Sequence, residues 1–113
     1  MKTLKKNYEF RNVLKNGKFY GGKYIDVIIV TNKKSRNYIG FAVQKKVAKA
    51  ITRNRLRRLI KENYRLIENK LSTGYDIVIM WKKNVPAEQA NFNLIKEDML
   101  KLFERAKLVG EKG

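Results

Sequence analysis

Arginine dominates one short stretch of the sequence, Arg53 to Arg58, where four of the six residues are arginines. A guanidinium group donates two parallel hydrogen bonds to a phosphate and also stacks on nucleobases, whereas a lysine ammonium acts as a point charge. The wider segment from Lys45 to Arg65 carries nine basic side chains and one acidic side chain, Glu62. A helix face that serves only solubility would alternate Glu with Lys. The segment therefore indicates phosphate binding.

The same segment has the periodicity of an amphipathic helix. At about 100° per residue, its large apolar side chains share one side, which we expect to face a core: Leu56, Leu59, Ile60, Tyr64, Ile67 and Leu71. Asn54 and most of the basic side chains point away from that side, namely Arg55, Arg57, Arg58, Lys61 and Arg65. Lys49 and Arg53 lie in the first turn, which we expect to project past the sheet. The positive end of the helix dipole adds to the attraction for phosphate there.

The composition excludes several classes of enzyme. The chain has 113 residues, 27 Lys plus Arg against 10 Asp plus Glu, and neither His nor Cys, for a formal net charge of +17. Without imidazole or thiolate there is no Ser/His or Cys/His nucleophile system and no ordinary zinc site. The few carboxylates do not cluster along the sequence, so we expect no metal site and no catalytic residue in this protein.

The charge is also unevenly distributed, because residues 1–65 hold sixteen of the seventeen net positive charges. Such concentrated repulsion destabilises a fold unless a polyanion neutralises it, and nucleic acid is the polyanion we expect. A membrane surface fits less well, since the basic helix has an ordinary core face and no lipid anchor is visible. No apolar run approaches a membrane span, and the absence of Cys fits a reducing compartment, so we expect a cytoplasmic protein.

The length and the 43% hydrophobic content predict one domain over residues 1–113, and its charge makes a single RNA-binding domain the expected organisation. The patterning predicts a helix over 7–16 capped by Asn7 and stopped by Gly17 in the left-handed conformation. It further predicts antiparallel strands over 24–31 and 38–44, an additional short strand near 18–20, a helix over 49–71, a strand over 75–81 and a helix over 92–109. The order α-β-β-α-β-α favours an α+β fold, a single-domain two-layer sandwich with a mixed sheet.

A groove is expected on one face of this sheet. Strand 24–31 alternates Tyr24, Asp26, Ile28 and Val30 on one face with apolar residues on the other, and strand 38–44 places small residues opposite Ile39, Phe41 and Val43. The first helix would wall the open face with Tyr8, Phe10 and Leu14. Aromatic stacking beside positive charge is how single-stranded RNA is bound, although the residues alone favour Phe10 as a core residue.

These features resemble the protein subunit of bacterial ribonuclease P. The resemblance centres on Arg53-Asn54-Arg55 within VQKKVAKAITRNRLRRLIKENYR, and extends more loosely through LKKNYEFRNVLKNGK and GYDIVIMWKK over most of the chain. It implies a fold like the second domain of ribosomal protein S5, with a left-handed βαβ crossover against the usual rule. In three positions the chain departs from the family pattern: Ala48 stands where Gly is common, Leu14 where an aromatic is common, and Met80-Trp81 where a smaller pair is usual.

The resemblance also implies the function and the partners. Arg53, Asn54 and Arg55 would face the catalytic RNA subunit, joined by Lys45, Lys46, Arg57, Arg58 and Lys61, and Lys49 and Arg65 complete the surface. The 5′ leader of precursor tRNA would lie in the cleft of Phe10, Leu14 and Ile28, beside Tyr8 and Tyr24. Mg²⁺ bound by the RNA would activate the water that releases the leader and leaves a 5′-phosphate. One monomeric protein would serve each RNA.

Two other functions share the composition. A ribosomal protein or another passive RNA binder would have the same charge, size and sandwich, but no effect on tRNA 5′ processing. A toxin-like endoribonuclease could work with Lys, Arg and Tyr in place of His, and would cleave RNA as protein alone.

Overall fold

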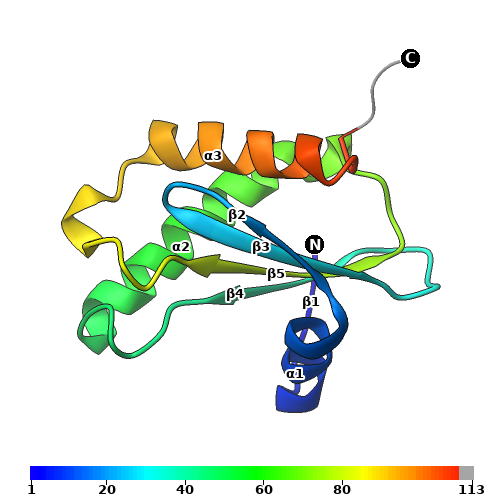
Figure 1. Cartoon of the computed structure of the whole chain (residues 1–113), viewed down its shortest axis with the longest axis horizontal. Coiled ribbons are helices and arrows are strands. Elements are labelled where there is room, and N and C mark those ends of the chain that lie inside the picture. Colours follow the sequence, from blue (N-terminus) through cyan, green and yellow to red (C-terminus); the bar gives the residue numbers. More distant parts are fainter. Residues whose placement is uncertain (110–113) are drawn as a thin grey trace.

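The computed structural model describes residues 1–109, which form a mixed five-stranded sheet with helices on both faces (Figure 1). The strands are β1 (Lys2–Thr3), β2 (Lys18–Gly21), β3 (Ile25–Thr31), β4 (Tyr38–Ala42) and β5 (Tyr75–Trp81). The helices are α1 (Asn7–Asn16), α2 (Ala50–Ile67) and α3 (Phe92–Arg105), with short 3₁₀ turns η1 (Glu68–Lys70) and η2 (Ala87–Gln89). The predicted α+β sandwich with a mixed sheet is confirmed.

The strand order β1-β4-β5-β3-β2 corrects one prediction about pairing. Strands β3 and β4, expected to be antiparallel partners, do not pair, because β5 lies between them. It runs antiparallel to β3, from Ile25 opposite Trp81 to Thr31 opposite Tyr75, and parallel to β4. Helix α2 thus connects two adjacent parallel strands, as the predicted crossover requires, and the hand of that crossover stays a prediction. The two-residue β1, which pairs with β4, was not predicted.

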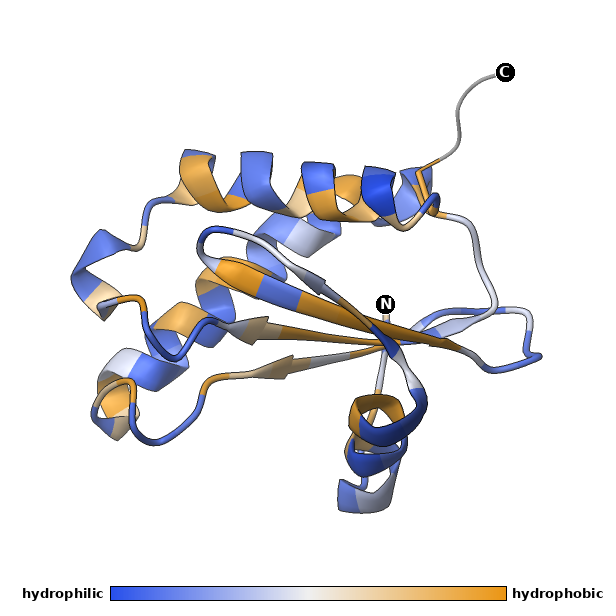
Figure 2. Cartoon of the chain, in the orientation of Figure 1, coloured by the Kyte–Doolittle hydropathy of each residue, from blue (hydrophilic) through white to orange (hydrophobic). Residues whose placement is uncertain are grey.

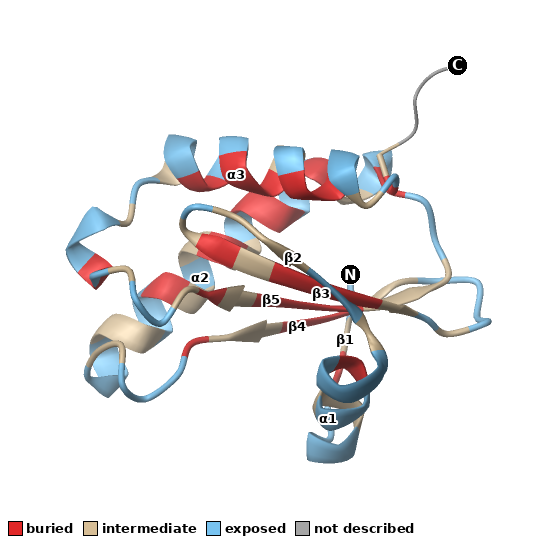
Figure 3. Ribbon diagram, viewed as in Figure 1, coloured by how far each residue is buried: buried red, intermediate tan, exposed pale blue. Residues whose placement is uncertain are grey.

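The main core lies between the sheet and helices α2 and α3, where buried residues line the facing surfaces (Figure 3). Strands β3 and β5 supply β-branched residues that pack well on a pleated surface, and they are strongly hydrophobic along their length (Figure 2). Trp81, Tyr64 and Phe103 are the largest fully buried side chains. The indole of Trp81 donates to the Val85 carbonyl oxygen at 2.8 Å, which gives this residue a packing role.

A second, smaller core lies on the opposite face, under α1. It contains Leu4, Val13, Ile28 and Val78, with Phe10 and other half-buried side chains around it. Within β3 and β4 the predicted alternation is confirmed, since Ile25, Val27 and Ile29 face the main core and Ile28 faces α1. Tyr24, which precedes β3, packs against the main core and not on the predicted face, and β4 ends at Ala42 and not at 44.

Helix ends differ in detail from the prediction. Lys6, not Asn7, precedes α1, and the Glu9 carboxylate accepts hydrogen bonds from the backbone N–H groups of Lys5 and Lys6. Gly17 is extended, with φ −83°, rather than left-handed. A Cβ at Gly17 would lie 2.7 Å from Ile28, so close packing explains this glycine. At the other end of the chain, α3 stops at Arg105 instead of 109, because Lys107 is left-handed and Val109 turns back to pair with Leu71.

Candidate nucleic-acid interface

The loop from β4 to α2 and the first turns of α2 carry the predicted phosphate-binding residues. Buried Val43 anchors the loop, after which Lys45, Lys46 and Lys49 are all exposed. Arg53 is half-buried and donates from Nη1 to the Ala48 carbonyl oxygen at 2.8 Å. This bond joins the end of the loop to the first turn of the helix, so Arg53 has a structural role as well as carrying charge itself.

Further along α2, a second contact orders the arginines. The Arg57 guanidinium donates to the Asn54 side-chain oxygen, while Arg55 and Arg58 extend into solvent. Asn54 therefore positions a cation, which gives the polar residue between Arg53 and Arg55 a physical role. Arg65 is exposed one turn beyond Lys61.

We call these residues the basic surface: Lys45, Lys46, Lys49, Arg53, Asn54, Arg55, Arg57, Arg58, Lys61 and Arg65. Over residues 1–109 the sole salt bridge joins Lys82 to Asp26, so no carboxylate neutralises the cations of this surface. The helix adds to the positive field, because its first turn contains no acidic residue and its N-cap, Lys49, makes no side-chain capping bond. Such a surface attracts a polyanion.

The predicted core face is confirmed within α2, with one addition, but the helix ends at Ile67 and not at 71, so Leu71, which was predicted on this face, is buried beyond the helix. Leu56, Ile60, Tyr64 and Ile67 are buried and Leu59 is half-buried. Asn63 is also buried; its amide donates to the carbonyl oxygens of Leu59 and Phe92 and so joins α2 to the start of α3. The basic residues thus stand on a helix that is firmly packed on its other side.

On the opposite face of the sheet, α1 crosses the strands and covers part of them. Phe10 packs directly on Gly40 of β4, where any Cβ would collide with its ring. Val13 packs with Ile28 and Val78 in the second core. Phe10 remains half-buried, so its ring belongs to this core and also borders the uncovered part of the sheet.

Leu14 faces that uncovered part. The Glu9 side of α1 is directed toward Tyr38, since the positive charge of Lys34 contributes to the lowered pKa of Glu9, and the Lys34 ammonium lies 4.8 Å from the centroid of the Tyr38 ring. Leu14 lies roughly 140° around the helix from Glu9, toward the other end of the strands, and it is 48% exposed. There Ala42 and Met80 form a floor, and the Gln44 amide lies 3.5 Å from the Met80 sulfur.

Three other residues that were predicted for the leader cleft lie elsewhere. Ile28 is 4% exposed, because α1 packs onto it. Tyr24 contacts the main core on the far side of the sheet, with its ring centroid 6.4 Å from that of Trp81. Tyr8 is 61% exposed and lies about 160° around α1 from Phe10, so it points away from the sheet. Of the five residues predicted for the leader cleft, only Phe10 and Leu14 border the uncovered part of the sheet.

Phe19, which was not predicted as a site residue, extends this face. It pairs with Ile28 across β2 and β3, is 60% exposed, and has the Lys82 ammonium 5.9 Å from its ring centroid. Lys82 in turn is paired with Asp26. Period-2 alternation through 18–21 was the available signal, because it places Phe19 on the face of Ile28. We call Phe10, Leu14, Phe19, Ala42, Met80 and Lys82 the open face.

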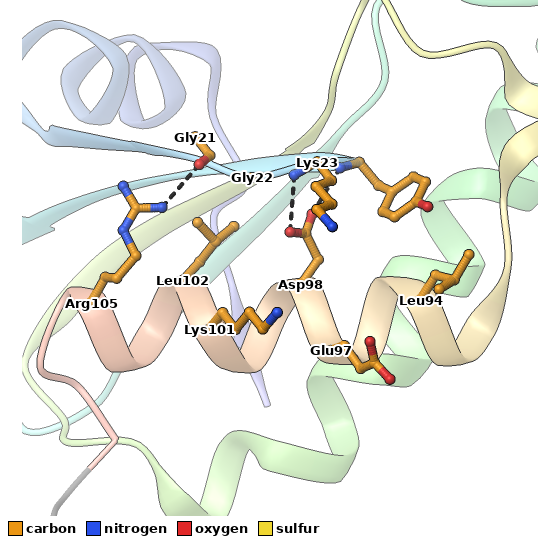
Figure 4. Close-up of a pocket in the computed structure, with 10 residues that line it drawn as sticks. Gly21, Gly22, Lys23, Leu94, Glu97, Asp98, Lys101, Leu102 and Arg105 are labelled. Atoms are coloured by element: carbon orange, nitrogen blue, oxygen red, sulfur yellow. Dashed lines mark hydrogen bonds between the residues drawn. The ribbon is translucent and has the colours of Figure 1, made fainter.

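A separate pocket of about 370 Å³ lies between α3 and the turn from β2 to β3, and Tyr24 lines it (Figure 4). Its buried carboxylate, Asp98, accepts hydrogen bonds from the backbone N–H groups of Lys23, Tyr24 and Ile25 at 2.9, 2.8 and 3.1 Å. Arg105 donates to the Gly21 carbonyl oxygen at 3.0 Å. These bonds fix the β2–β3 turn on α3, so the Asp98 carboxylate and the Arg105 guanidinium of this pocket are engaged by the fold itself.

Residues 1–109 contain no group of three or more Asp, Glu, His or Cys side chains that could hold a metal ion. Among the same residues, none of the helices has the length and apolar character needed to cross a membrane.

Comparison with known proteins gives a consistent result. The family model described as "Ribonuclease P" matches residues 1–107. The ribonuclease P protein component of Clostridioides difficile strain 630 is 47% identical over 105 residues, which cover 92% of this chain and 90% of that protein. The component from Fusobacterium nucleatum is 39% identical over 111 residues, covering 96% of this chain and 100% of that protein.

Solved structures share the fold. The RNase P protein of Thermotoga maritima superposes with a TM-score of 0.82 at 27% identity over the full length of both chains. That of Staphylococcus aureus gives a TM-score of 0.84 at 24% identity, covering 97% of this chain and 99% of that one.

Proposed function

The chain belongs to the ribonuclease P protein family, and from that premise we propose that it binds the catalytic RNA through the basic surface and precursor tRNA through the open face. In this role it assists removal of the 5′ leader, leaving a 5′-phosphate on the mature tRNA. As a ribonuclease P protein component it is a partner of the ribonuclease P RNA.

One observation carries the proposal: the basic surface concentrates nine cations on one helix and its loop without a carboxylate partner in the described chain. Two large RNAs repel each other strongly, and a protein that neutralises phosphates lowers the cost of bringing them together. The bond from Arg53 to Ala48 and the bond from Arg57 to Asn54 hold part of this charge in a fixed arrangement. Fixed cations lose less conformational freedom on binding than mobile ones.

The open face fits a single-stranded leader. Phe10 and Phe19 supply aromatic surface, Ala42 and Met80 supply a shallow apolar floor, and the Lys82 ammonium, which is paired with Asp26, lies near the Phe19 ring. Stacking on aromatic rings beside cations binds unpaired bases with little sequence preference. The open face and the basic surface lie on opposite sides of the sheet, so the protein can hold two different RNA segments at the same time.

We assign the chemistry to Mg²⁺ held by the RNA subunit. Mg²⁺ prefers oxygen ligands and activates a water for attack on a phosphodiester. The protein offers no clustered carboxylates in residues 1–109, which supports leaving the catalytic ions to RNA oxygens. The protein's own residues bind and orient.

Reconstitution tests the proposal. The protein is mixed with its cognate catalytic RNA at a Mg²⁺ concentration too low for the RNA alone, and cleavage of precursor tRNA is followed by gel electrophoresis. We expect the protein to restore cleavage at the mature 5′ end. No gain over RNA alone contradicts the proposal, and cleavage by the protein without RNA identifies the toxin-like alternative instead.

A matched pair of variants tests the basic surface in the same assay. Arg55→Ala removes an exposed arginine of α2, whereas Lys96→Ala removes an exposed cation of α3, far from it in the sequence. We expect the first to raise the protein concentration needed for cleavage and the second to leave it unchanged. Equal losses would mean that only net charge matters.

A further inference from the structure

Phe41 has a different environment from the other aromatic residues beside cations. It lies in β4 with its side chain on the main-core side of the sheet, opposite in direction to Ala42 of the open face. Its ring meets Tyr64 edge-on, with centroids 6.0 Å apart and an interplanar angle of 68°. The ring is half-buried, so one part is held by the core and another part reaches the surface.

That surface is a groove of about 330 Å³ lined by Phe41 and three cations of the basic surface, Arg57, Arg58 and Lys61. No acidic residue lines it. Its volume lies at the lower end of the range of about 300–1,000 Å³ that is typical of small-ligand pockets.

The cations surround the ring of Phe41 without covering it. Elsewhere in residues 1–109, lysine or arginine heads lie over Phe19, Tyr20 and Tyr38 at 4.8 to 6.0 Å from the ring centroids, and none does so over Phe41. Arg57 is instead directed toward Asn54. The aromatic surface therefore stays available, with positive charge at its border.

The sheet edge beside the groove is open as well. Within the described chain, β1 pairs with β4 only at Tyr38 and Ile39, apart from a bond from the Leu4 N–H to the Ile39 carbonyl oxygen. From Gly40 to Ala42 the outer edge of β4 has no strand partner. Backbone donors and acceptors at this edge can bond to the polar edges of a base.

We propose that an unpaired nucleotide of the catalytic RNA inserts into this groove, with its base stacked on Phe41 and its flanking phosphates on Arg57, Arg58 and Lys61. The inference rests on the proposed function, because three residues that line the groove belong to the basic surface, which we propose binds the catalytic RNA. A nucleotide of the leader is the less suitable occupant, since the open face lies on the other side of the sheet. A base on Phe41 adds a contact with one particular nucleotide to the phosphate contacts, which position the RNA but do not read its bases.

Two substitutions separate stacking from packing. Phe41→Leu keeps an apolar side chain in contact with Tyr64 but removes the aromatic surface, and Phe41→Trp keeps an aromatic surface. We measure the affinity of the full-length protein for its cognate catalytic RNA as a function of salt, together with the melting temperature of each variant. We expect Phe41→Leu to bind roughly tenfold more weakly and Phe41→Trp to bind as tightly as the parent protein.

The salt dependence distinguishes this role from charge. Phe41→Leu should leave the slope of log affinity against log salt unchanged, because all phosphate contacts remain. Arg58→Gln should reduce that slope by about 0.7 to 0.9 for the lost contact. In addition, RNA should quench the fluorescence of the tryptophan introduced in Phe41→Trp. The native Trp81 is fully buried, so its fluorescence should stay constant when RNA is added.

Two results overturn the inference: Phe41→Leu binding as tightly as the parent protein, or an unquenched Phe41→Trp that binds as weakly as Phe41→Leu. A loss seen only when leader-bearing tRNA is added would assign the base to the leader and also overturn it. If the parent protein binds the catalytic RNA and restores cleavage while Phe41 proves irrelevant, the proposed function stands alone. If the parent protein fails to bind that RNA, both the proposed function and this inference are contradicted.

Discussion

The two faces of the sheet are built in different ways. The face under α2 and α3 holds the main core, including Trp81, Tyr64 and Phe103, and opens to the surface at Phe41 of β4. The face under α1 has a fully buried core of four residues, Leu4, Val13, Ile28 and Val78, and stays partly uncovered. One face supplies stability and the other leaves a surface for a ligand. The basic surface stands on the stable face, which can tolerate the repulsion among its cations.

Core truncation tests this contrast and has the largest expected effect. Phe103→Ala should lower the free energy of unfolding by about 3–5 kcal/mol, because it removes a fully buried ring from the main core. Val13→Ala, on the other face, should cost about 2 kcal/mol. Urea denaturation followed by circular dichroism measures both. Equal losses would mean that the two cores contribute alike.

Phe10→Ala tests whether the open face binds substrate. We expect a loss of about 1–3 kcal/mol in binding of leader-bearing precursor tRNA by the holoenzyme, with a smaller loss for mature tRNA, because only the former has a base to stack. Fluorescence titration with both RNAs measures the difference. Val13→Ala is the control, since it disturbs α1 without removing an exposed ring. A loss of the same size for mature tRNA would make Phe10 purely structural.

A smaller effect separates two neighbouring arginines. Arg53→Ala should lower both the stability, by about 1 kcal/mol, and the affinity for catalytic RNA, because it also removes the bond to the Ala48 carbonyl. Arg55→Ala should lower the affinity alone and reduce the salt slope by about 0.7 to 0.9. Thermal unfolding and filter binding distinguish the two roles. An unchanged slope for Arg55→Ala would remove that residue from the interface.

The smallest expected effect concerns the start of α1. Hydrogen bonds from the backbone N–H groups of Lys6 and Lys5 lower the pKa of Glu9 below its ordinary value of 4.5. A lowered pKa in the folded protein means that Glu9 stabilises α1 at neutral pH and loses this effect as the pH falls through the folded pKa. Glu9→Gln should make the melting temperature less sensitive to acid. An NMR titration of the Glu9 carboxyl checks the direction of the shift.

Much of the architecture could be predicted from the sequence, because the elements have strong periodicity. The bounds of α1 and of the strand ending at Trp81 agree with the prediction, and β2 was anticipated as a short strand. The pairing of 24–31 with 38–44 was wrong, since hydrophobic alternation fixes which face a residue takes but not which strand lies beside it. β5, which is apolar on both faces, is the strand best suited to the centre.

The two parts of the candidate site also differ in how far they could be predicted from the sequence. The basic surface could be predicted almost completely, because charge on the outer side of an amphipathic helix follows from its own period. The leader cleft could not be predicted, because its lining depends on where α1 packs on the sheet. The packing of α1 buries Ile28, which the strand pattern alone had placed on an open face. Phe19 was missed since a four-residue strand at a sheet edge carries little pattern.

The central place of β5 has a consequence for how the chain acquires its structure. The residues that carry nearly all of the net positive charge are synthesised before residues 75–81. Strands β3 and β4 cannot become part of one sheet until β5, the last strand, pairs with both of them. Contacts between segments far apart in sequence form slowly. The newly made N-terminal part is thus a charged, incompletely paired sheet for a time, and a nascent chain truncated before Tyr75 should fail to fold although it contains the whole arginine-rich segment.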